Sequence, residues 1–150
     1  MNGDDKWMKV AIQEAIKAKE EGEVPVGAIL VKDDIIIAKA HNQPILKNDA
    51  TAHAEVQLIR AAGLIQKNYR LTGTSLFVTL EPCMMCLGAI MHARIARIVY
   101  GANDQKKEVC GPCSDLSNAT FFKHNIDIYG GVLKDECSEL LKTFFQSRRY

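Results

Sequence analysis

Residues 75–100 read SLFVTLEPCMMCLGAIMHARIARIVY and predict the strand–helix–strand unit on which the fold is built. The nearly continuous apolar run Ser75–Thr79 predicts a buried strand, and Ile95–Tyr100 predicts a second one. Between them, Pro82 favours the first turn of a helix that continues to about His92, because the N–H that proline lacks is not needed there. Strands that alternate with helices usually pair in parallel, so this stretch indicates an α/β fold.

The residues on either side of this unit predict a hairpin before it and one more strand and helix after it. Val24–Val31 and Ile35–Ala40 are rich in β-branched residues and flank a polar turn, so we expect them to pair antiparallel. The other expected elements are a helix from a cap at Asp4 or Asp5 to about Glu20, a loop over His41–Ala50, a helix over His53–Ala62 between a Thr51 cap and a Gly63 stop, an irregular loop over Gly101–Thr120, a strand over Ile126–Tyr129 and a helix over Lys134–Arg148. The prediction is a mixed five-stranded sheet with helices on both faces.

The bulk composition bounds the class of protein. A chain of 150 residues fits one domain, and we expect a single domain over residues 1–150. The net charge of +1 gives no global basic field that would indicate nucleic acid. The polar start of the chain has no signal core, and no apolar run approaches the roughly 20 residues of a membrane span. Five cysteines, two of them at a metal-type spacing, favour a reduced, cytoplasmic protein without a disulfide framework.

A histidine, a glutamate and two cysteines predict a metal centre. His53, Cys83 and Cys86 can hold a single Zn²⁺ and leave its fourth position open, as in catalytic zinc sites. Cys83 and Cys86 are three residues apart and share one face of a helical turn. His53 and Glu55 are two residues apart, so on a helix both can reach one object only if it lies off the helix N-terminus. Glu55 is not needed as a ligand and is therefore the candidate proton carrier.

A second cysteine pair leaves an alternative open. Cys110 and Cys113 could join Cys83 and Cys86 in a four-cysteine structural zinc site. The 23 residues between the pairs exceed the usual spacing of about 15–20. That alternative also leaves His53 and Glu55 without a role, so the three-ligand site is favoured. Cys137, on an apolar face of the last helix, is expected in the core.

Several stretches of the chain resemble the bacterial tRNA-specific adenosine deaminases of the cytidine deaminase superfamily. They are GEVPVGA at 22–28, TAHAE at 51–55, TLEPCMMC at 79–86 and FFQSRR at 144–149. The resemblance implies a three-layer α/β/α cytidine-deaminase-like fold and a homodimer. It also implies hydrolysis of the wobble adenosine, position 34, to inosine in the anticodon stem-loop of a tRNA, typically an arginine tRNA. In that reaction water activated by one Zn²⁺ per subunit attacks C6, and ammonia is released.

The resemblance also assigns roles to individual residues. Zinc ligands are expected at His53, Cys83 and Cys86, the proton shuttle at Glu55, and purine contacts at Asn42 and the Ala54 N–H. Phe145 and Arg149 are expected to contact the anticodon loop, whose splayed bases proteins read by stacking and arginine contacts. Asp104 is a candidate acceptor for a ribose 2′-OH. The helix after Pro82 is apolar almost all round, and a subunit interface would cover it.

Two other functions compete with this one. A small-molecule deaminase of the same fold, acting on guanine or cytosine, would carry the same zinc motifs, but the aromatic and basic C-terminus argues against it. A catalytically inactive RNA-binding subunit would use zinc only structurally, and the intact Glu55 argues against that. The chain departs from the family pattern at Lys106–Cys110, where many relatives have small residues, so its loop contacts to RNA are expected to differ.

Overall fold

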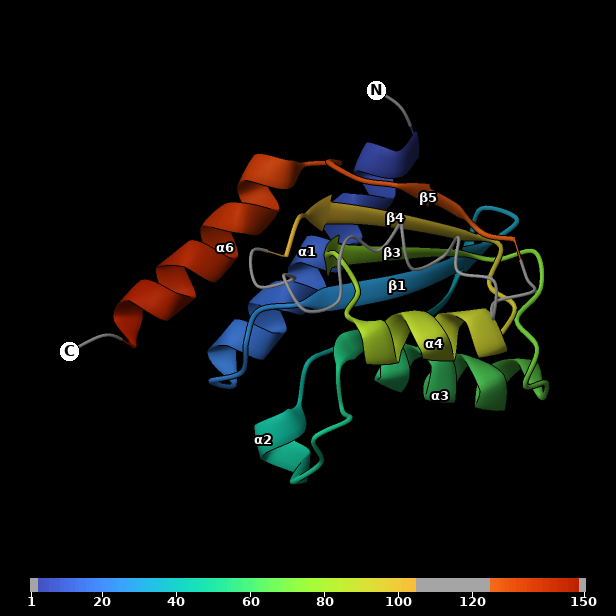
Figure 1. Ribbon diagram of the computed structural model, residues 1–150, viewed down its shortest axis with the longest axis horizontal. Helices are drawn as coiled ribbons and strands as arrows, with labels where there is room; N and C mark the ends of the chain where they lie inside the picture. Colours follow the sequence, from blue (N-terminus) through green and yellow to red (C-terminus); the bar gives the residue numbers. More distant parts are fainter. Residues whose placement is uncertain (1–2, 105–124, 149–150) are drawn as a thin grey trace.

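A computed structural model describes residues 3–104 and 125–148, and Figure 1 shows their arrangement. In chain order the elements are α1 (Gly3–Glu20), β1 (Gly27–Lys32), β2 (Ile35–His41), α2 (Pro44–Lys47), α3 (Ala54–Gln66), β3 (Ser75–Leu80), α4 (Met84–His92), β4 (Arg97–Ala102), β5 (Asp127–Tyr129) and α6 (Lys134–Ser147). The cysteine pair Cys110 and Cys113 and the candidate RNA contact Arg149 lie outside the described residues.

The strands form one sheet in the order β2-β1-β3-β4-β5. β1 is antiparallel to β2 and to β3, whereas β4 is parallel to both of its neighbours, β3 and β5. Asp33 and Asp34 join β1 to β2 and have φ values of 51° and 61°. Positive φ at both central residues is what a two-residue type I′ hairpin turn requires. The mixed five-stranded sheet predicted from the sequence is therefore confirmed.

Helices cover both faces of the sheet, which confirms the predicted three layers (Figure 1). On one face, Leu58 of α3 and Ile90 of α4 pack with Leu76 and Val78 of β3. On the other, Met8 of α1 and Cys137 of α6 pack with Phe77 of β3. Successive residues of β3 thus point to opposite cores, as the pleat of a strand requires. Cys137 is in the core, as expected.

The approach of α1 to β1 is unusually close at Gly27. A Cβ atom at this position would lie 2.2 Å from the carbonyl oxygen of Ala11 and 2.7 Å from the Cβ of Glu14. Both distances are far inside van der Waals contact, so any side chain at Gly27 would push the helix off the sheet. This approach places Glu14, a residue that is 4% exposed, close to His41 at the end of the hairpin.

The short helix α2 was not predicted, because His41–Ala50 was expected to be a loop. Its N-terminal amides are satisfied by Glu23, whose carboxylate accepts hydrogen bonds from Ile45 N–H at 3.2 Å and Leu46 N–H at 2.8 Å. A helix start needs such acceptors for its unpaired N–H groups. The acceptor here comes from a residue more than 20 positions away, so the local sequence carries no sign of it.

Three predicted helix starts were wrong by a few residues. α1 begins at Gly3, so Asp4 and Asp5 lie in its first turn rather than at its cap. α3 begins at Ala54 with His53 as its cap, whereas Thr51 instead hydrogen bonds to Asp49. At α4 the cap is Cys83, and Pro82 precedes the helix.

The predicted stop of α3 at Gly63 was also wrong. The helix continues to Gln66 and ends where Lys67 adopts the left-handed conformation with a φ of 54°. The Lys67 N–H then bonds to the Gly63 carbonyl, which closes the last turn. Glycine is tolerated inside a helix at a cost of about 1 kcal/mol, so Gly63 alone does not end it.

The helices of the described residues were compared with what a membrane span requires. None of them is both long enough and apolar enough to cross a bilayer.

Candidate active site

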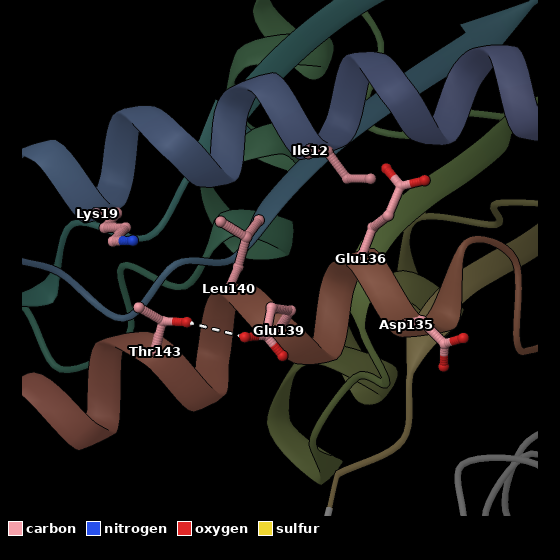
Figure 2. A pocket seen from close by; sticks show the side chains of 7 residues that line it. All are labelled: Ile12, Lys19, Asp135, Glu136, Glu139, Leu140 and Thr143. Atoms are coloured by element: carbon pink, nitrogen blue, oxygen red, sulfur yellow. Dashed lines mark hydrogen bonds between the residues drawn. The ribbon is translucent and has the colours of Figure 1, made fainter.

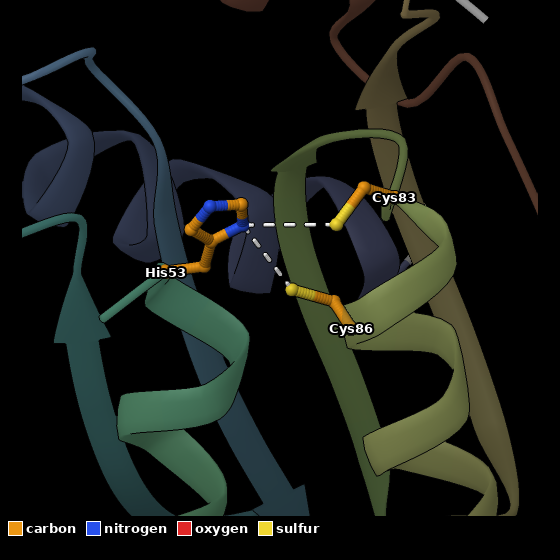
Figure 3. Close-up of side chains that lie close together, drawn as sticks. All are labelled: His53, Cys83 and Cys86. Atoms are coloured by element: carbon orange, nitrogen blue, oxygen red, sulfur yellow. Dashed lines mark hydrogen bonds between the residues drawn. The ribbon is translucent and has the colours of Figure 1, made fainter. Parts of the chain in front are cut away.

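The three predicted metal ligands come together where two helices begin. His53 caps α3 with extended backbone angles, φ −68° and ψ 154°, and Cys83 caps α4 in the same way, with φ −75° and ψ 174°. Cys86 lies in the first turn of α4. Figure 3 shows the imidazole of His53 facing both sulfur atoms across the gap between the two helices. Both positive helix ends therefore point at one position, which favours thiolates there.

The distances within this cluster match a tetrahedral metal site. His53 Nδ1 lies 3.7 Å from Cys83 Sγ and 3.4 Å from Cys86 Sγ. The three candidate ligand atoms all lie within 4.8 Å of one another. Zinc bonds of about 2.3 Å to sulfur and about 2.0–2.1 Å to nitrogen, at tetrahedral angles, place the nitrogen and sulfur ligands about 3.6 Å apart. The geometry and the donor set of this cluster therefore both fit a zinc ion.

The thiols of Cys83 and Cys86 have pKa values that shift in opposite directions. A hydrogen bond from Cys86, followed by contact with His53, lowers the pKa of Cys83 to about 4. The same hydrogen bond, together with burial, raises the pKa of Cys86. The contact with Cys83 raises the pKa of His53. Without a metal, Cys83 is therefore a thiolate stabilised by its neighbours, and a metal must displace the remaining proton from Cys86.

Glu55 lies next to this cluster, in the first turn of α3. The residue is 4% exposed and interacts with Cys83, His53 and Cys86. Burial is the main reason that its pKa rises to about 7. A carboxyl group with a pKa near neutrality can both take up and release a proton at physiological pH, as a general acid–base catalyst must.

Asn42 and Ala54, the two predicted purine contacts, bind each other. The Asn42 Oδ1 accepts a hydrogen bond of 2.7 Å from the Ala54 N–H, and both residues are buried. Because the backbone group can only donate, the side-chain oxygen must face it and the Asn42 amide NH₂ points elsewhere. This contact joins the end of the β1–β2 hairpin to the start of α3, beside His53.

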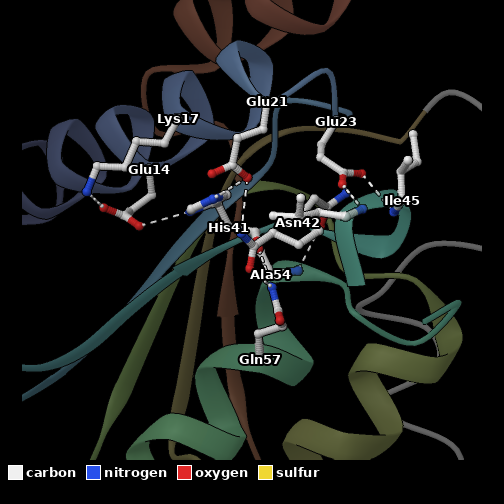
Figure 4. Close-up of polar contacts among 11 residues, drawn as sticks. Glu14, Lys17, Glu21, Glu23, His41, Asn42, Ile45, Ala54 and Gln57 are labelled. Atoms are coloured by element: carbon white, nitrogen blue, oxygen red, sulfur yellow. Dashed lines mark hydrogen bonds and ion pairs between the residues drawn. The ribbon is translucent and has the colours of Figure 1, made fainter. Parts of the chain in front are cut away.

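Sequence reasoning missed the polar groups that surround Asn42, which Figure 4 shows together. The ring of His41, the residue before Asn42, points toward α1, where it meets Glu14 and, in the turn after the helix, Glu21. Gln57 of α3 binds the His41 carbonyl from the other side. These partners are distant in sequence and fit ordinary helix surfaces, so no local signal identified them.

Two of the predicted RNA contacts line the same cavity. Asp104 and Phe145 line a space of about 400 Å³ between α6 and the ends of β3 and β4, together with Leu80 and Ala102. Phe145 is 41% exposed, whereas its neighbour Phe144 is only 6% exposed. Leu80 precedes Cys83 by three residues, so the cavity lies close to the metal-ligating turn.

The end of α6 is held by an arginine. Arg148 donates a hydrogen bond of 3.0 Å to the Gly22 carbonyl, and its guanidinium lies 4.5 Å from the centre of the Phe144 ring. Arg148 is therefore engaged within the chain, while Phe145 faces the cavity.

A different groove of about 650 Å³ runs between α1 and α6 and is lined by Ile12, Lys19, Asp135, Glu136, Glu139, Leu140 and Thr143 (Figure 2). None of the candidate site residues lines it. The metal cluster and this groove lie on opposite faces of the sheet, because α3 and α4 cover one face and α1 and α6 the other.

Known proteins resemble this chain in sequence over nearly its whole length. The sequence profile of the MafB19-like deaminase family matches residues 2–149. A tRNA-specific adenosine deaminase of Buchnera aphidicola is 45% identical over 99% of this chain and 98% of its own length. Its counterpart in Bacillus subtilis is 43% identical over 99% of this chain and 92% of its own length.

Solved structures extend the similarity to the fold. A structure from a study of A-to-I editing by tRNA:A34 deaminases superimposes with a TM-score of 0.86 at 42% identity, over 91% of this chain and 99% of that one. A guanine deaminase from Nitrosomonas europaea has a TM-score of 0.78 at 20% identity, over 93% of this chain and 83% of its own, which is a likeness of fold alone. The chain belongs to the family of tRNA-specific adenosine deaminases.

Proposed function

We propose that this protein hydrolyses the wobble adenosine of a tRNA, position 34, to inosine and ammonia at a zinc site formed by His53, Cys83 and Cys86. The observation that carries the proposal is the convergence of one imidazole and two thiols beside a buried glutamate. The full-length similarity to tRNA-specific adenosine deaminases supports the substrate. We further infer that the substrate is an arginine tRNA, as the resemblance implies.

The zinc ion would be held by His53 Nδ1 and by the two sulfur atoms, whose negative charges balance that of Zn²⁺. Three protein ligands leave a fourth position for water or substrate, which distinguishes a catalytic from a structural site. When bound, zinc supplies an electrophilic centre that makes water a nucleophile near neutral pH. We expect one ion per chain.

Glu55 would carry the protons. With the pKa raised to about 7 by burial, its carboxylate can accept a proton from the attacking water. It can then donate that proton to the amino nitrogen on C6, which leaves as ammonia. The hydroxyl group stays on C6, and transfer of its proton to N1 gives the carbonyl of inosine. One carboxyl group thus serves first as base and then as acid.

Asn42 would orient the base. Since its Oδ1 is engaged by the Ala54 N–H, Asn42 can offer its amide NH₂ as a donor to an acceptor nitrogen of the purine. A purine contact from the Ala54 N–H itself requires the base to compete with Asn42 for this donor. The pair therefore fixes which end of the Asn42 amide faces the substrate.

The anticodon loop would occupy the cavity that Asp104 and Phe145 line. The exposed Phe145 ring offers a stacking surface for a splayed base, which is how single-stranded loops are commonly bound. Asp104, two residues after the end of β4, would accept a hydrogen bond from a ribose 2′-OH. Arg149, just beyond α6, would contribute a cation to the same RNA segment.

A homodimer would cover the apolar side chains near this site. Met84 and Met85 in the first turn of α4 are 54% and 39% exposed, and Ile45 and Leu46 of α2 are 72% and 59% exposed. Figure 1 shows α2 and α4 on the same side of the sheet. Exposed apolar groups gathered in this way mark interaction surfaces. We also propose a cytoplasmic location, which a tRNA substrate and the use of reduced thiols would support.

The decisive experiment compares substrates on one zinc-quantified sample. An anticodon stem-loop with adenosine at position 34 is incubated with the protein, and inosine is measured by digestion and chromatography. Free guanine, cytosine and adenosine are the parallel substrates, because a small-molecule deaminase of the same fold is the competing function. Inosine in the stem-loop with no turnover of the free bases supports the proposal. Turnover of a free base alone would replace it.

A further inference from the structure

His41 is the last residue of β2, and its ring lies between two carboxylates of different segments (Figure 4). Its Nδ1 is 3.3 Å from Glu14 Oε1 and its Nε2 is 3.0 Å from Glu21 Oε1. The His41 side chain is 14% exposed and that of Glu14 is 5% exposed, so this contact is shielded from solvent, whereas the Glu21 side chain is 35% exposed. The histidine thus bridges α1 and the turn after it to the end of the hairpin.

Two side chains share the carboxylate of Glu14. A carboxylate oxygen only accepts hydrogen bonds, so a His41 ring nitrogen that carries a hydrogen donates to the carboxylate that it faces. Lys17 binds the other oxygen of Glu14, with its Nζ 2.7 Å from Oε2. His41, Lys17, Glu14 and Glu21 thus form one polar cluster, in which both oxygens of Glu14 have a partner.

Further hydrogen bonds connect this cluster to the residues on both sides of Asn42. Gln57 Nε2 donates to the His41 carbonyl at 2.6 Å and to Gln43 Oε1 at 3.2 Å. Gln43 Nε2 in turn donates to Glu21 Oε1 at 3.0 Å. The preceding and following residues of Asn42 are therefore anchored to α1 and to the first turn of α3.

We propose, on the basis of the function proposed above, that His41 is a positioning residue for base binding. By bridging Glu14 and Glu21 it fixes the end of β2, and so the direction in which the Asn42 amide faces the purine. Of His41 and Asn42, only Asn42 would touch the substrate. Catalytic geometry is sensitive to such support, because misplacing a reacting group by about 1 Å can cost about 100-fold in rate. A histidine that merely tied α1 to the sheet would affect stability without acting through Asn42.

The test removes the bridge from the full-length, zinc-loaded protein. His41→Phe keeps an aromatic ring but removes both ring nitrogens, so kcat/KM for the adenosine-34 stem-loop is expected to fall about 10- to 100-fold. The zinc content should remain one per chain. His92→Phe is the matched control, because His92 is an exposed histidine at the end of α4, outside the cluster, and its kcat/KM should stay within about twofold. Glu21→Gln is a milder second variant, because it removes one charge from a partly exposed partner and should lower kcat/KM without unfolding the chain.

A double-mutant cycle separates positioning from a structural role. If His41 acts through Asn42, then His41→Phe should change kcat/KM by less than about twofold in an Asn42→Ala background. Multiplying losses in the double variant would overturn the inference, and so would full activity of a folded His41→Phe protein. If the wild-type protein makes no inosine, the proposed function itself fails, and this outcome is distinct from either of those results.

Discussion

The Sγ atom of Cys86 lies 3.4 Å from Nδ1 of His53, although 33 residues separate them in the chain. Cys83 completes the group at 3.7 Å from the same nitrogen. Neither helix brings all three ligands by itself, so the site exists only because the starts of α3 and α4 lie side by side on one face of the sheet. A metal bound here would also link these two helices.

This geometry predicts which cysteines hold the metal. Cys86→Ser should reduce bound zinc from one per chain to below about one tenth, because a serine hydroxyl is a far weaker zinc ligand than a thiolate. Cys137→Ser is the control, since Cys137 lies in the other core and should leave the zinc content unchanged. Replacing Cys110 and Cys113 together should also leave it unchanged. Loss of zinc from that double variant, measured by atomic emission, would revive the four-cysteine site.

Glu55→Gln should separate metal binding from turnover. The variant preserves the size of the side chain and is expected to keep one zinc per chain. It cannot transfer protons, so kcat should fall at least about 100-fold, the lower end of what general acid–base catalysis contributes. The measurement is single-turnover inosine formation beside metal analysis of the same preparation. A variant with wild-type turnover would show that another group carries the proton.

The buried carboxyl of Glu55 also predicts a pH dependence of stability in the metal-free protein. Its pKa is about 7 in the folded state against 4.5 as a free side chain, so folding favours the protonated form. As the pH rises from about 4.5 to 7, the unfolded chain loses this proton first, and the wild type loses stability.

Glu55→Gln has no such proton to lose and isolates this effect. The metal-free variant should equal the wild type in stability near pH 4.5 and exceed it above pH 7 by at most about 3 kcal/mol. Urea unfolding of chelator-treated samples at several pH values measures the difference. A difference that stays constant or shrinks with rising pH would contradict the raised pKa.

Gly101 predicts a compensating pair of substitutions. A Cβ at this position would lie 2.4 Å from Cys137 Sγ, so Gly101→Ala should destabilise the fold by about 1–3 kcal/mol. Cys137→Ala removes the obstructing sulfur and should restore part of that loss in the double variant. Gly88→Ala is the control, since nothing lies within 4 Å of its added methyl group. Thermal unfolding of the four proteins would show the coupling, and strictly additive losses would contradict it.

Adjacent phenylalanines in α6 should respond differently to truncation. Phe144 is buried, so Phe144→Ala should lower the free energy of unfolding by about 3–5 kcal/mol. Phe145 is partly exposed at the cavity, so Phe145→Ala should leave stability nearly unchanged. If it stacks on a base, stem-loop binding should weaken by about 1–3 kcal/mol, which is roughly 5- to 150-fold in Kd. If the wild type and Phe145→Ala bind the stem-loop equally in a fluorescence titration, Phe145 is not part of the RNA site.

Much of the fold could be predicted because its signals are local. The apolar run of β3 and the paired aspartates of the hairpin each carry their conformation within a few residues. Helix ends were less predictable. Gly63 resembles a stop, yet α3 passes through it, since the remaining contacts of the helix outweigh the small cost of one glycine. Thr51 resembles a cap, but its hydroxyl is engaged by Asp49.

The candidate site likewise has residues that the sequence points to and contacts that only the structure shows. The sequence by itself determined the metal ligands and the proton carrier as candidates, because zinc restricts donors to a few residue types at short spacings. Only the tertiary structure decided that Asn42 binds the Ala54 N–H, that Glu23 caps α2, and that His41 lies between Glu14 and Glu21. These polar contacts join residues 10 or more positions apart. Such a hydrogen bond depends on the relative placement of whole elements, which the packing of the core sets and no local pattern encodes.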